Sequence, residues 1–148
     1  MSPHASSTRR FGFAAGHRYW VEAWTPAENG RVFGRLTVPH GHNYTLDVTV
    51  RGPIDPQTGM VIDLAELKRI VAETVVERFD HADLNADPLF RGRVPTTENV
   101  AVAVWELLAP KLGADRLARV RVWEDPTLYV DVRGEPPGGE PSGEMARK

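Results

Sequence analysis

The sequence predicts an α+β domain in which helices pack on one face of an antiparallel β-sheet. Three observations support this prediction: period-two apolar patterns in the first third of the chain, two helical apolar patterns in the middle, and a hairpin pattern near the end. The predicted order is strand, strand, helix, helix, strand, strand. With 148 residues, 41% of them hydrophobic, the chain has the size and composition of one globular domain.

Residues 9–16 alternate apolar and other side chains, which predicts a half-buried strand that runs into His17. Residues 20–39 contain prolines and glycines without sustained periodicity, and we expect a long irregular loop of the kind that often carries function. From His42 to Arg51 the alternation is clean and predicts a second strand, which Gly52 ends.

A turn is predicted at residues 55–59, and the apolar piece at residues 60–62 is either a strand or a continuation of the previous one. Asp63 then has the features of an N-cap. The helix that follows has an apolar face formed by Leu64, Leu67, Ile70, Val71, Val75 and Phe79.

Pro95 and the two threonines after it predict the start of a second helix. Its apolar face is formed by Ala101, Val104, Trp105 and Leu108. A terminal hairpin is predicted around the turn at residues 125–127, with apolar positions at Val120, Val122, Leu128, Val130 and Val132.

The chain ends differ in composition from the rest. Residues 1–8 are small and polar, and residues 135–148 are rich in proline, glycine and charge, so both are predicted to be disordered. No repeat or linker divides residues 9–134, which we expect to form a single domain.

Composition and charge also exclude classes of function. A formal charge of −2 gives no overall attraction to nucleic acid or to an anionic membrane. No apolar run approaches the roughly 18 residues of a membrane span, and the first ten residues lack the apolar core of a signal peptide, so we expect a cytoplasmic protein. The chain has no cysteine, which excludes disulfides and thiolate chemistry and directs attention to the histidines.

His40 and His42 are two residues apart at a strand start, so both imidazoles lie on one face of the sheet. His17 ends another predicted strand. Three neutral imidazoles leave one position of a tetrahedral zinc ion open, as in catalytic sites, and we expect ligand distances of about 2.0–2.1 Å. Two alternatives to a metal site stay open. His40 and His42 could be an incidental pair of polar residues at a strand start, and His17 could be a core histidine hydrogen-bonded to a backbone carbonyl.

Two further groups carry possible chemistry. Asp80 and His81 form a candidate proton shuttle, the alternative being a turn-capping aspartate beside a solvated histidine. Glu124 has the parity of inward-facing Val120 and Val122, and a carboxylate there would pair with two adjacent N–H donors of a guanine- or pterin-like ring. The alternative is a strand-end glutamate that turns out to solvent.

Thr96, Thr97 and Glu98 mark a helix N-terminus, whose free backbone N–H groups are also suited to holding a ligand.

Several separated segments resemble the 6-pyruvoyltetrahydropterin and 6-carboxytetrahydropterin synthase family. The resemblance covers about residues 9–134 and lies in FAAGHR (13–18), ENGRVFGR (28–35), HGHNYTLDVTV (40–50), IDPQTGMVIDLAELK (54–68), FDHADLN (79–85), PTTENVAVAVW (95–105) and VRVWED (120–125). It implies a T-fold (tunnelling fold): a four-stranded antiparallel sheet with two helices on one face, assembling into a barrel of trimers and then a homohexamer with active sites between subunits.

The resemblance also implies roles for residues. His17, His40 and His42 would bind zinc, Asp80 and His81 would belong to the proton relay, and Glu124 would anchor the pterin ring. Thr96 and Thr97 of the neighbouring chain, with Glu98 nearby, would help to hold that ring.

The implied reaction is that of a zinc-dependent lyase. Its substrate would be the small molecule 7,8-dihydroneopterin triphosphate, from which triphosphate is eliminated without an organic cofactor. Such a reaction belongs to tetrahydropterin or queuosine biosynthesis, and the sequence leaves the pathway open.

One position departs from the family pattern. Leu36 stands where typical members carry a catalytic cysteine, and two residues before His40 are missing. Family variants with a glutamate in this loop cleave the dihydroneopterin side chain, but no acid lies between Asn29 and His42. The alternatives are therefore side-chain cleavage, with Glu28 as the remote substitute, or a catalytically reduced pterin- or purine-binding homologue.

Overall fold

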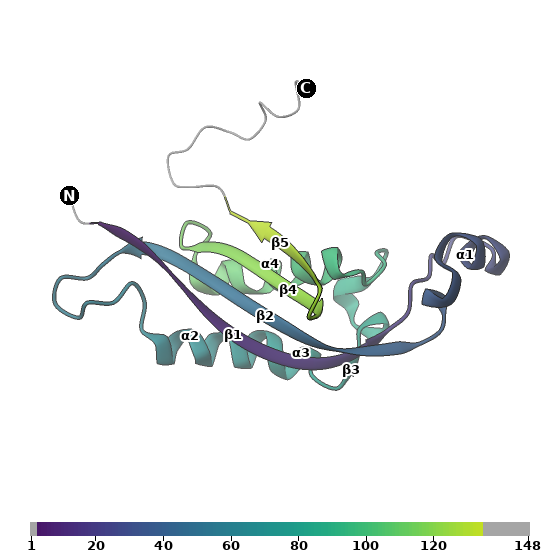
Figure 1. Ribbon diagram of the computed structural model, residues 1–148, viewed down its shortest axis with the longest axis horizontal. Coiled ribbons are helices and arrows are strands. Elements are labelled where there is room, and N and C mark those ends of the chain that lie inside the picture. The colour runs from purple at the N-terminus through teal and green to yellow at the C-terminus, as the bar shows by residue number, and fades with distance from the viewer. Residues whose placement is uncertain (1–2, 135–148) are drawn as a thin grey trace, which may run out of the picture.

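The computed structural model describes residues 3–134, which form one sheet with the strand order β3-β1-β2-β4-β5 (Figure 1). The strands are β1 (His4–His17), β2 (His40–Pro53), β3 (Ala82–Asp83), β4 (Leu117–Asp125) and β5 (Leu128–Arg133). The pairs β1–β2, β2–β4 and β4–β5 are antiparallel, as predicted. The fifth strand, β3, runs parallel to β1 and was not predicted, because two residues are too few to show a period.

The helices are α1 (Pro26–Phe33), α2 (Leu64–Val71), α3 (Glu77–Phe79) and α4 (Thr97–Leu112). A π-helical turn at Ala72–Val76 joins α2 to α3, so the helix predicted after Asp63 is continuous. Asp63 is its N-cap, as predicted, and accepts a hydrogen bond from the backbone N–H of Ala65. Short 3₁₀ turns lie at Gly34–Thr37, Leu84–Ala86 and Pro88–Phe90.

One face of the sheet is covered by α2, α3 and α4, and the core lies between them. Its fully buried side chains include Leu46, Val48, Val120 and Val122 from the sheet and Leu67, Val71, Val75, Phe79, Val100, Val104 and Leu108 from the helices. Complete burial of such a side chain is worth about 1.5–3 kcal/mol. Leu64, predicted on the apolar face, is 47% exposed instead, because it lies in the first helical turn.

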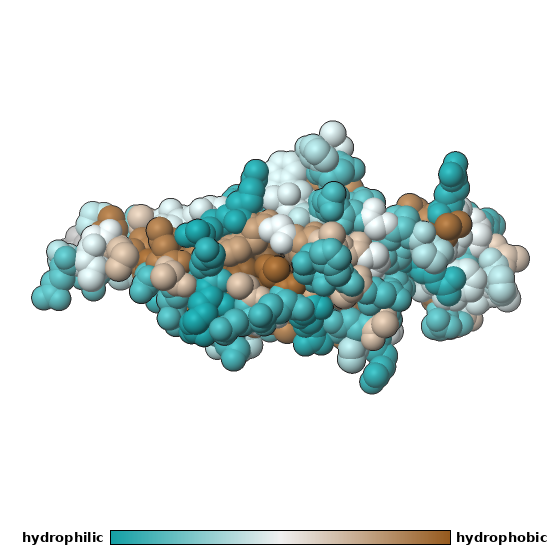
Figure 2. Space-filling model, turned by 90° about the horizontal axis from the view of Figure 1, so that it is seen from below, coloured by the Kyte–Doolittle hydropathy of each residue, from teal (hydrophilic) through white to brown (hydrophobic). Residues whose placement is uncertain are grey.

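The opposite face of the sheet is not covered by any helix among residues 3–134, and we call it the open face (Figure 1). Seen from below, the molecule shows a band of apolar side chains between hydrophilic margins, along the stretch where α2 lies in Figure 1 (Figure 2). No helix of the described chain is long and apolar enough to cross a membrane.

The structure corrects the prediction of a disordered leader at residues 1–8. Strand β1 begins at His4, which pairs with Pro53, and the hydroxyls of Thr8 and Thr49 lie 2.7 Å apart. Pairing with β2 satisfies the backbone of this polar stretch, a gain that its own composition does not reveal. The predicted tail at residues 135–148 lies outside the described residues.

The predicted irregular loop at residues 20–39 contains helix α1. Thr25 is its N-cap, with its hydroxyl accepting from the N–H of Glu28, and Pro26 begins the helix. The buried Asn29 side chain links the helix to the preceding chain through hydrogen bonds with Val21. Capping and this polar contact hold α1, so the sequence shows little apolar periodicity there.

The remaining predictions concern the turns. The turn at residues 55–59 is confirmed by a 2.8 Å hydrogen bond from the N–H of Gly59 to the carbonyl of Asp55. Residues 60–62 are not a strand. The β4–β5 hairpin is confirmed, and Asp125 accepts from both the N–H and the hydroxyl of Thr127 in its turn.

Candidate metal and ligand site

Three histidines converge at one end of the sheet. His17 at the end of β1 pairs directly with His40 at the start of β2, and His42 follows two residues later on the same face. The centroid of the His17 ring lies 4.6 Å from the centroid of the His40 ring and 5.1 Å from that of the His42 ring. One ligand atom from each ring lies within 4.8 Å of the others. The predicted convergence of this histidine triad is confirmed.

Backbone carbonyls orient two members of the triad. The Nδ1 atoms of His17 and His40 lie 2.7 Å from the carbonyl oxygens of Pro95 and Val38. A carbonyl only accepts, so each Nδ1 carries the proton and each Nε2 keeps a free lone pair. Nε2 of His17 is buried without a hydrogen-bond partner among the described residues, and burial lowers the pKa of this imidazole. A neutral ring with an unpartnered buried lone pair fits a metal ligand.

Glu124 extends the site from β4. Its Oε1 atom accepts a 3.0 Å hydrogen bond from the buried hydroxyl of Thr97 and lies 3.6 Å from Nε2 of His42. The glutamate therefore points inward beside the triad, as its parity predicts, and its side chain keeps 14% exposure. Thr97 of the same chain makes this contact, and the role of the neighbouring chain's threonines in holding a pterin stays a prediction.

Thr96 and Glu98 lie at the same helix start as Thr97, but the structure shows no hydrogen bond from either of them to Glu124. Thr96 is the N-cap of α4 and its hydroxyl accepts from the N–H of Asn99. Glu98 is exposed in the first helical turn, close enough to Tyr19 to help raise the pKa of that phenol. Of the three residues predicted at this helix start, Thr97 is the one that contacts Glu124.

Aromatic rings around the triad were not singled out from the sequence. The rings of Tyr19 and Tyr44 lie 5.4 and 6.2 Å from the His17 ring between centroids, and Phe33 contacts Tyr19. Burial, with the charge of Glu124, raises the pKa of Tyr44 and raises that of Tyr19 to about 12. Both phenols are thus protonated donors at neutral pH. The sequence did contain a signal for Tyr44, because it alternates with His40 and His42 along β2 and so lies on the same face.

Asp80 and His81 form a pair with each other. His81 Nδ1 lies 3.0 Å from Asp80, whose other oxygen accepts from the N–H of Ala14, and this hydrogen bond lowers the pKa of Asp80. The His81 side chain is 83% exposed and borders a hollow that is also lined by Gly41, Asn43 and His42, a member of the triad. Among the described residues, no hydrogen bond or ion pair links the dyad to the triad.

Leu36 lies next to the site. Its carbonyl accepts a 2.8 Å hydrogen bond from the N–H of Tyr19, and its side chain is 43% exposed. The position aligned with a catalytic cysteine thus holds an aliphatic side chain without proton-transfer chemistry.

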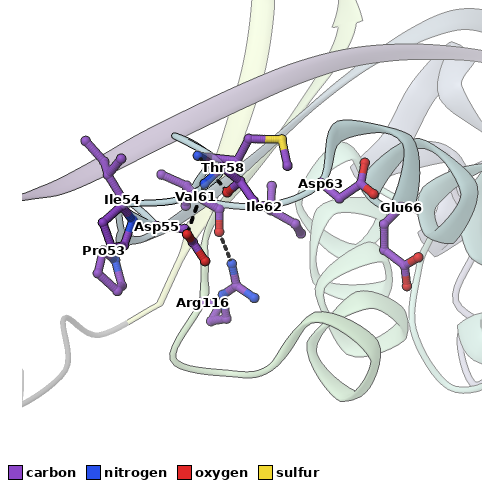
Figure 3. Close-up of a pocket in the computed structure, with 11 residues that line it drawn as sticks. Pro53, Ile54, Asp55, Thr58, Val61, Ile62, Asp63, Glu66 and Arg116 are labelled. Carbon is purple, nitrogen blue, oxygen red and sulfur yellow. Dashed lines mark hydrogen bonds between the residues drawn. The ribbon is translucent and has the colours of Figure 1, made fainter.

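A wide hollow of about 840 Å³ lies elsewhere, between the end of β2 and the start of α2 (Figure 3). Its polar groups are already engaged: Arg116 donates to the carbonyl of Val61, Asp55 accepts from two backbone N–H groups, and Asp63 caps α2. Among the described residues, only the histidine triad groups three side chains that could hold a metal ion, so we assign function to the histidine site.

Comparison with known proteins agrees with this geometry. Residues 6–135 match the family model of 6-pyruvoyl tetrahydropterin synthase. The chain belongs to this family. Human 6-pyruvoyl tetrahydrobiopterin synthase is 42% identical over 134 residues, covering 88% of this chain and 92% of the human protein. The Drosophila melanogaster synthase is 40% identical over 141 residues, covering 93% and 84%.

Among solved structures, Caenorhabditis elegans 6-pyruvoyl tetrahydropterin synthase superposes with a TM-score of 0.85 at 35% identity, covering 90% of this chain and 98% of that chain. Membership of the 6-pyruvoyl tetrahydropterin synthase family establishes the T-fold predicted from the motifs. It also makes this chain a relative of tetrahydropterin and tetrahydrobiopterin synthases.

Proposed function

We propose that the protein is a zinc-dependent pterin lyase that acts on 7,8-dihydroneopterin triphosphate and eliminates triphosphate. The observation that carries the proposal is the histidine triad beside an inward-facing carboxylate. A zinc ion held by His17, His40 and His42 would supply a Lewis acid that lowers the pKa of the substrate's side-chain hydroxyls.

Glu124 is suited to the ring of the substrate. The amino-pyrimidinone edge of a pterin presents two adjacent N–H groups, which match the two oxygens of a carboxylate. The hydroxyl of Thr97 holds one of these oxygens at 3.0 Å and so fixes the plane of the acceptor. Burial of the Glu124 side chain strengthens such a charge-assisted pair, because water competes less there.

The proton-transfer group is the second requirement. Tyr19 and Tyr44 are unsuited as bases because their pKa values are raised. We assign this role to His81: the 3.0 Å contact with Asp80 holds the proton on Nδ1 and leaves Nε2 as the base. Since the His81 side chain is exposed, it would serve the triad of a neighbouring chain.

Product analysis tests the proposal. Zinc-loaded protein is incubated with 7,8-dihydroneopterin triphosphate, and pterin products and released triphosphate are identified. We expect triphosphate release with a tetrahydropterin product that keeps the side-chain carbons. Release of 6-hydroxymethyl-dihydropterin would instead indicate side-chain cleavage. Binding without turnover would indicate a pterin-binding homologue with reduced catalytic activity, in keeping with Leu36 at the position of the cysteine.

A matched variant separates ring binding from metal binding. Glu124→Gln places an amide donor opposite a donor of the ring, so pterin affinity should fall by roughly ten- to a hundredfold. Zinc content should stay unchanged, because Glu124 is not a member of the triad. Equal pterin affinity of variant and parent would contradict the assignment of Glu124.

A further inference from the structure

The open face carries a second polar site. Cross-strand pairing places Thr8, Thr49, Arg119 and Arg133 in one row across β1, β2, β4 and β5. A cavity of about 510 Å³ lies over this row and is lined by Ser6, Thr8, Thr49, Arg51, Arg119 and Arg133, among others. Thr49 is seven residues from His42, about 23 Å along the strand, so this site is separate from the histidine triad.

The row contains like charges in direct opposition. Arg119 pairs across the strands with Arg133, and two cations at directly opposed positions destabilise a sheet. The next row holds the carboxylates Asp47 and Asp131. The two rows together hold four arginines, namely Arg10, Arg119, Arg121 and Arg133, against these two aspartates.

Both aspartates accept hydrogen bonds from arginines other than Arg119. Asp47 accepts two hydrogen bonds from Arg10 and one from Trp123. Asp131 accepts two from Arg121 and a 3.2 Å contact from Arg133. Arg119 therefore forms no direct ion pair among the described residues, although its charge helps to lower the pKa of Asp47 and of Asp131.

Arg119 also carries a donor without an acceptor. Its Nε atom is buried and has no hydrogen-bond partner in the described part of the chain. Arginine stays protonated, so this N–H group needs an acceptor. A buried N–H group without a hydrogen bond costs free energy. Beside it, the hydroxyls of Thr8 and Thr49 lie 2.7 Å apart. One hydroxyl donates to the other, which leaves one O–H able to donate to a ligand.

We propose that this cavity binds a phosphate oxyanion, either free phosphate or one phosphate group of a polyphosphate chain. A tetrahedral oxyanion offers several acceptor atoms at once, which matches the guanidinium groups of Arg119 and Arg133 and a threonine hydroxyl. Its negative charge would also relieve the repulsion between the two arginines. The site is independent of the proposed lyase function.

Calorimetric titration tests the proposal on the whole zinc-loaded protein at constant ionic strength. One arm uses inorganic phosphate and the other inorganic triphosphate, with chloride as the balancing anion. We expect saturable binding of at least one anion. Tighter binding of phosphate would identify free phosphate as the ligand, and tighter binding of triphosphate would identify a polyphosphate chain. Arg119→Gln and Arg133→Gln should each weaken this binding roughly tenfold or more, because a charge-assisted contact is lost.

Two controls make the result specific. Arg69→Gln removes the same charge from the surface of α2 and should leave phosphate affinity unchanged. Phosphate should raise the Tm of the parent more than that of Arg119→Gln, because the variant lacks one of the guanidinium groups that bind it. Absence of binding of both anions, or equal binding by parent and Arg119→Gln, would overturn the proposal.

Discussion

At the residue scale, the triad is prepared by groups that are not ligands. The carbonyls of Pro95 and Val38 hold the protons of His17 and His40 on Nδ1, so both Nε2 lone pairs are free. His42 is held differently, because its Nε2 lies 3.6 Å from Glu124. This histidine therefore connects the triad to the residue that we assign to the pterin ring.

Replacing one ligand should remove the metal. In His42→Ala two imidazoles remain, too few for a zinc site with three protein ligands, so zinc content should fall from about one per chain to well below that value. Metal analysis of the purified protein measures this change, and circular dichroism checks the fold. His4→Ala is the matched control, because His4 lies at the far end of β1. Full zinc content in His42→Ala would refute the assigned triad.

At the element scale, β2 organises both faces of the molecule. Its alternation sends His40, His42 and Tyr44 to the helix-covered face, while Asp47 lies on the open face and is 5% exposed. The hydrogen bonds from Arg10 lower the pKa of Asp47 against the opposing effect of burial, and Trp123 adds to the lowering. A single strand thus carries the metal ligands and a buried anchor for its neighbours.

The lowered pKa of Asp47 makes the free energy of unfolding depend on pH. A carboxyl group with a lower pKa in the folded state contributes stability above its unfolded pKa of about 3.9, and loses it as pH falls through the folded pKa. Asp47→Asn should therefore lower the free energy of unfolding at pH 7 by about 1 kcal/mol, a modest value because the Arg10 side chain is 66% exposed. The difference between parent and variant should shrink below about pH 4.

Denaturant titrations across pH, at fixed protein concentration, measure this difference. Glu73→Gln is the control, because the Glu73 carboxylate is 57% exposed in a surface ion pair with Arg69. A constant gap between parent and Asp47→Asn at every pH would argue against the ionised role of Asp47.

At the scale of the whole molecule, the sheet has incomplete edges. Strand β1 pairs with β3 only at Ala15 and Gly16, and β5 pairs only with β4 among the described strands. Unpaired strand edges invite pairing with another chain. Leu128 and Tyr129 on β5 are each 43% exposed, and Figure 2 shows further apolar surface on the molecule. These features favour association through the edges.

We therefore expect a trimer or a hexamer in solution. Pairing of β1 in one chain with β5 of the next would satisfy both edges and close the sheets into a barrel. It would also allow His81 of one chain to approach the triad of another. Light scattering at micromolar concentration should give a mass of at least three times the 16.4 kDa of one chain. A monomeric mass would contradict the expected assembly.

Sequence patterns alone predict the α+β class, the two longer helical segments, the hairpin and the shared face of His40 and His42, whereas the place of His17 in the triad rested on the family resemblance. In these segments periodicity and residue type act locally: alternation assigns His40, His42 and Glu124 to one face whatever packs against it. Other features depend on partners that are distant in sequence and are visible only in the folded chain. Residues 4–8 form a strand because β2 pairs with them, and α1 depends on its cap and on Asn29. Likewise, Thr97 reaches Glu124, and Arg119 faces Arg133, only because separate elements meet across the fold.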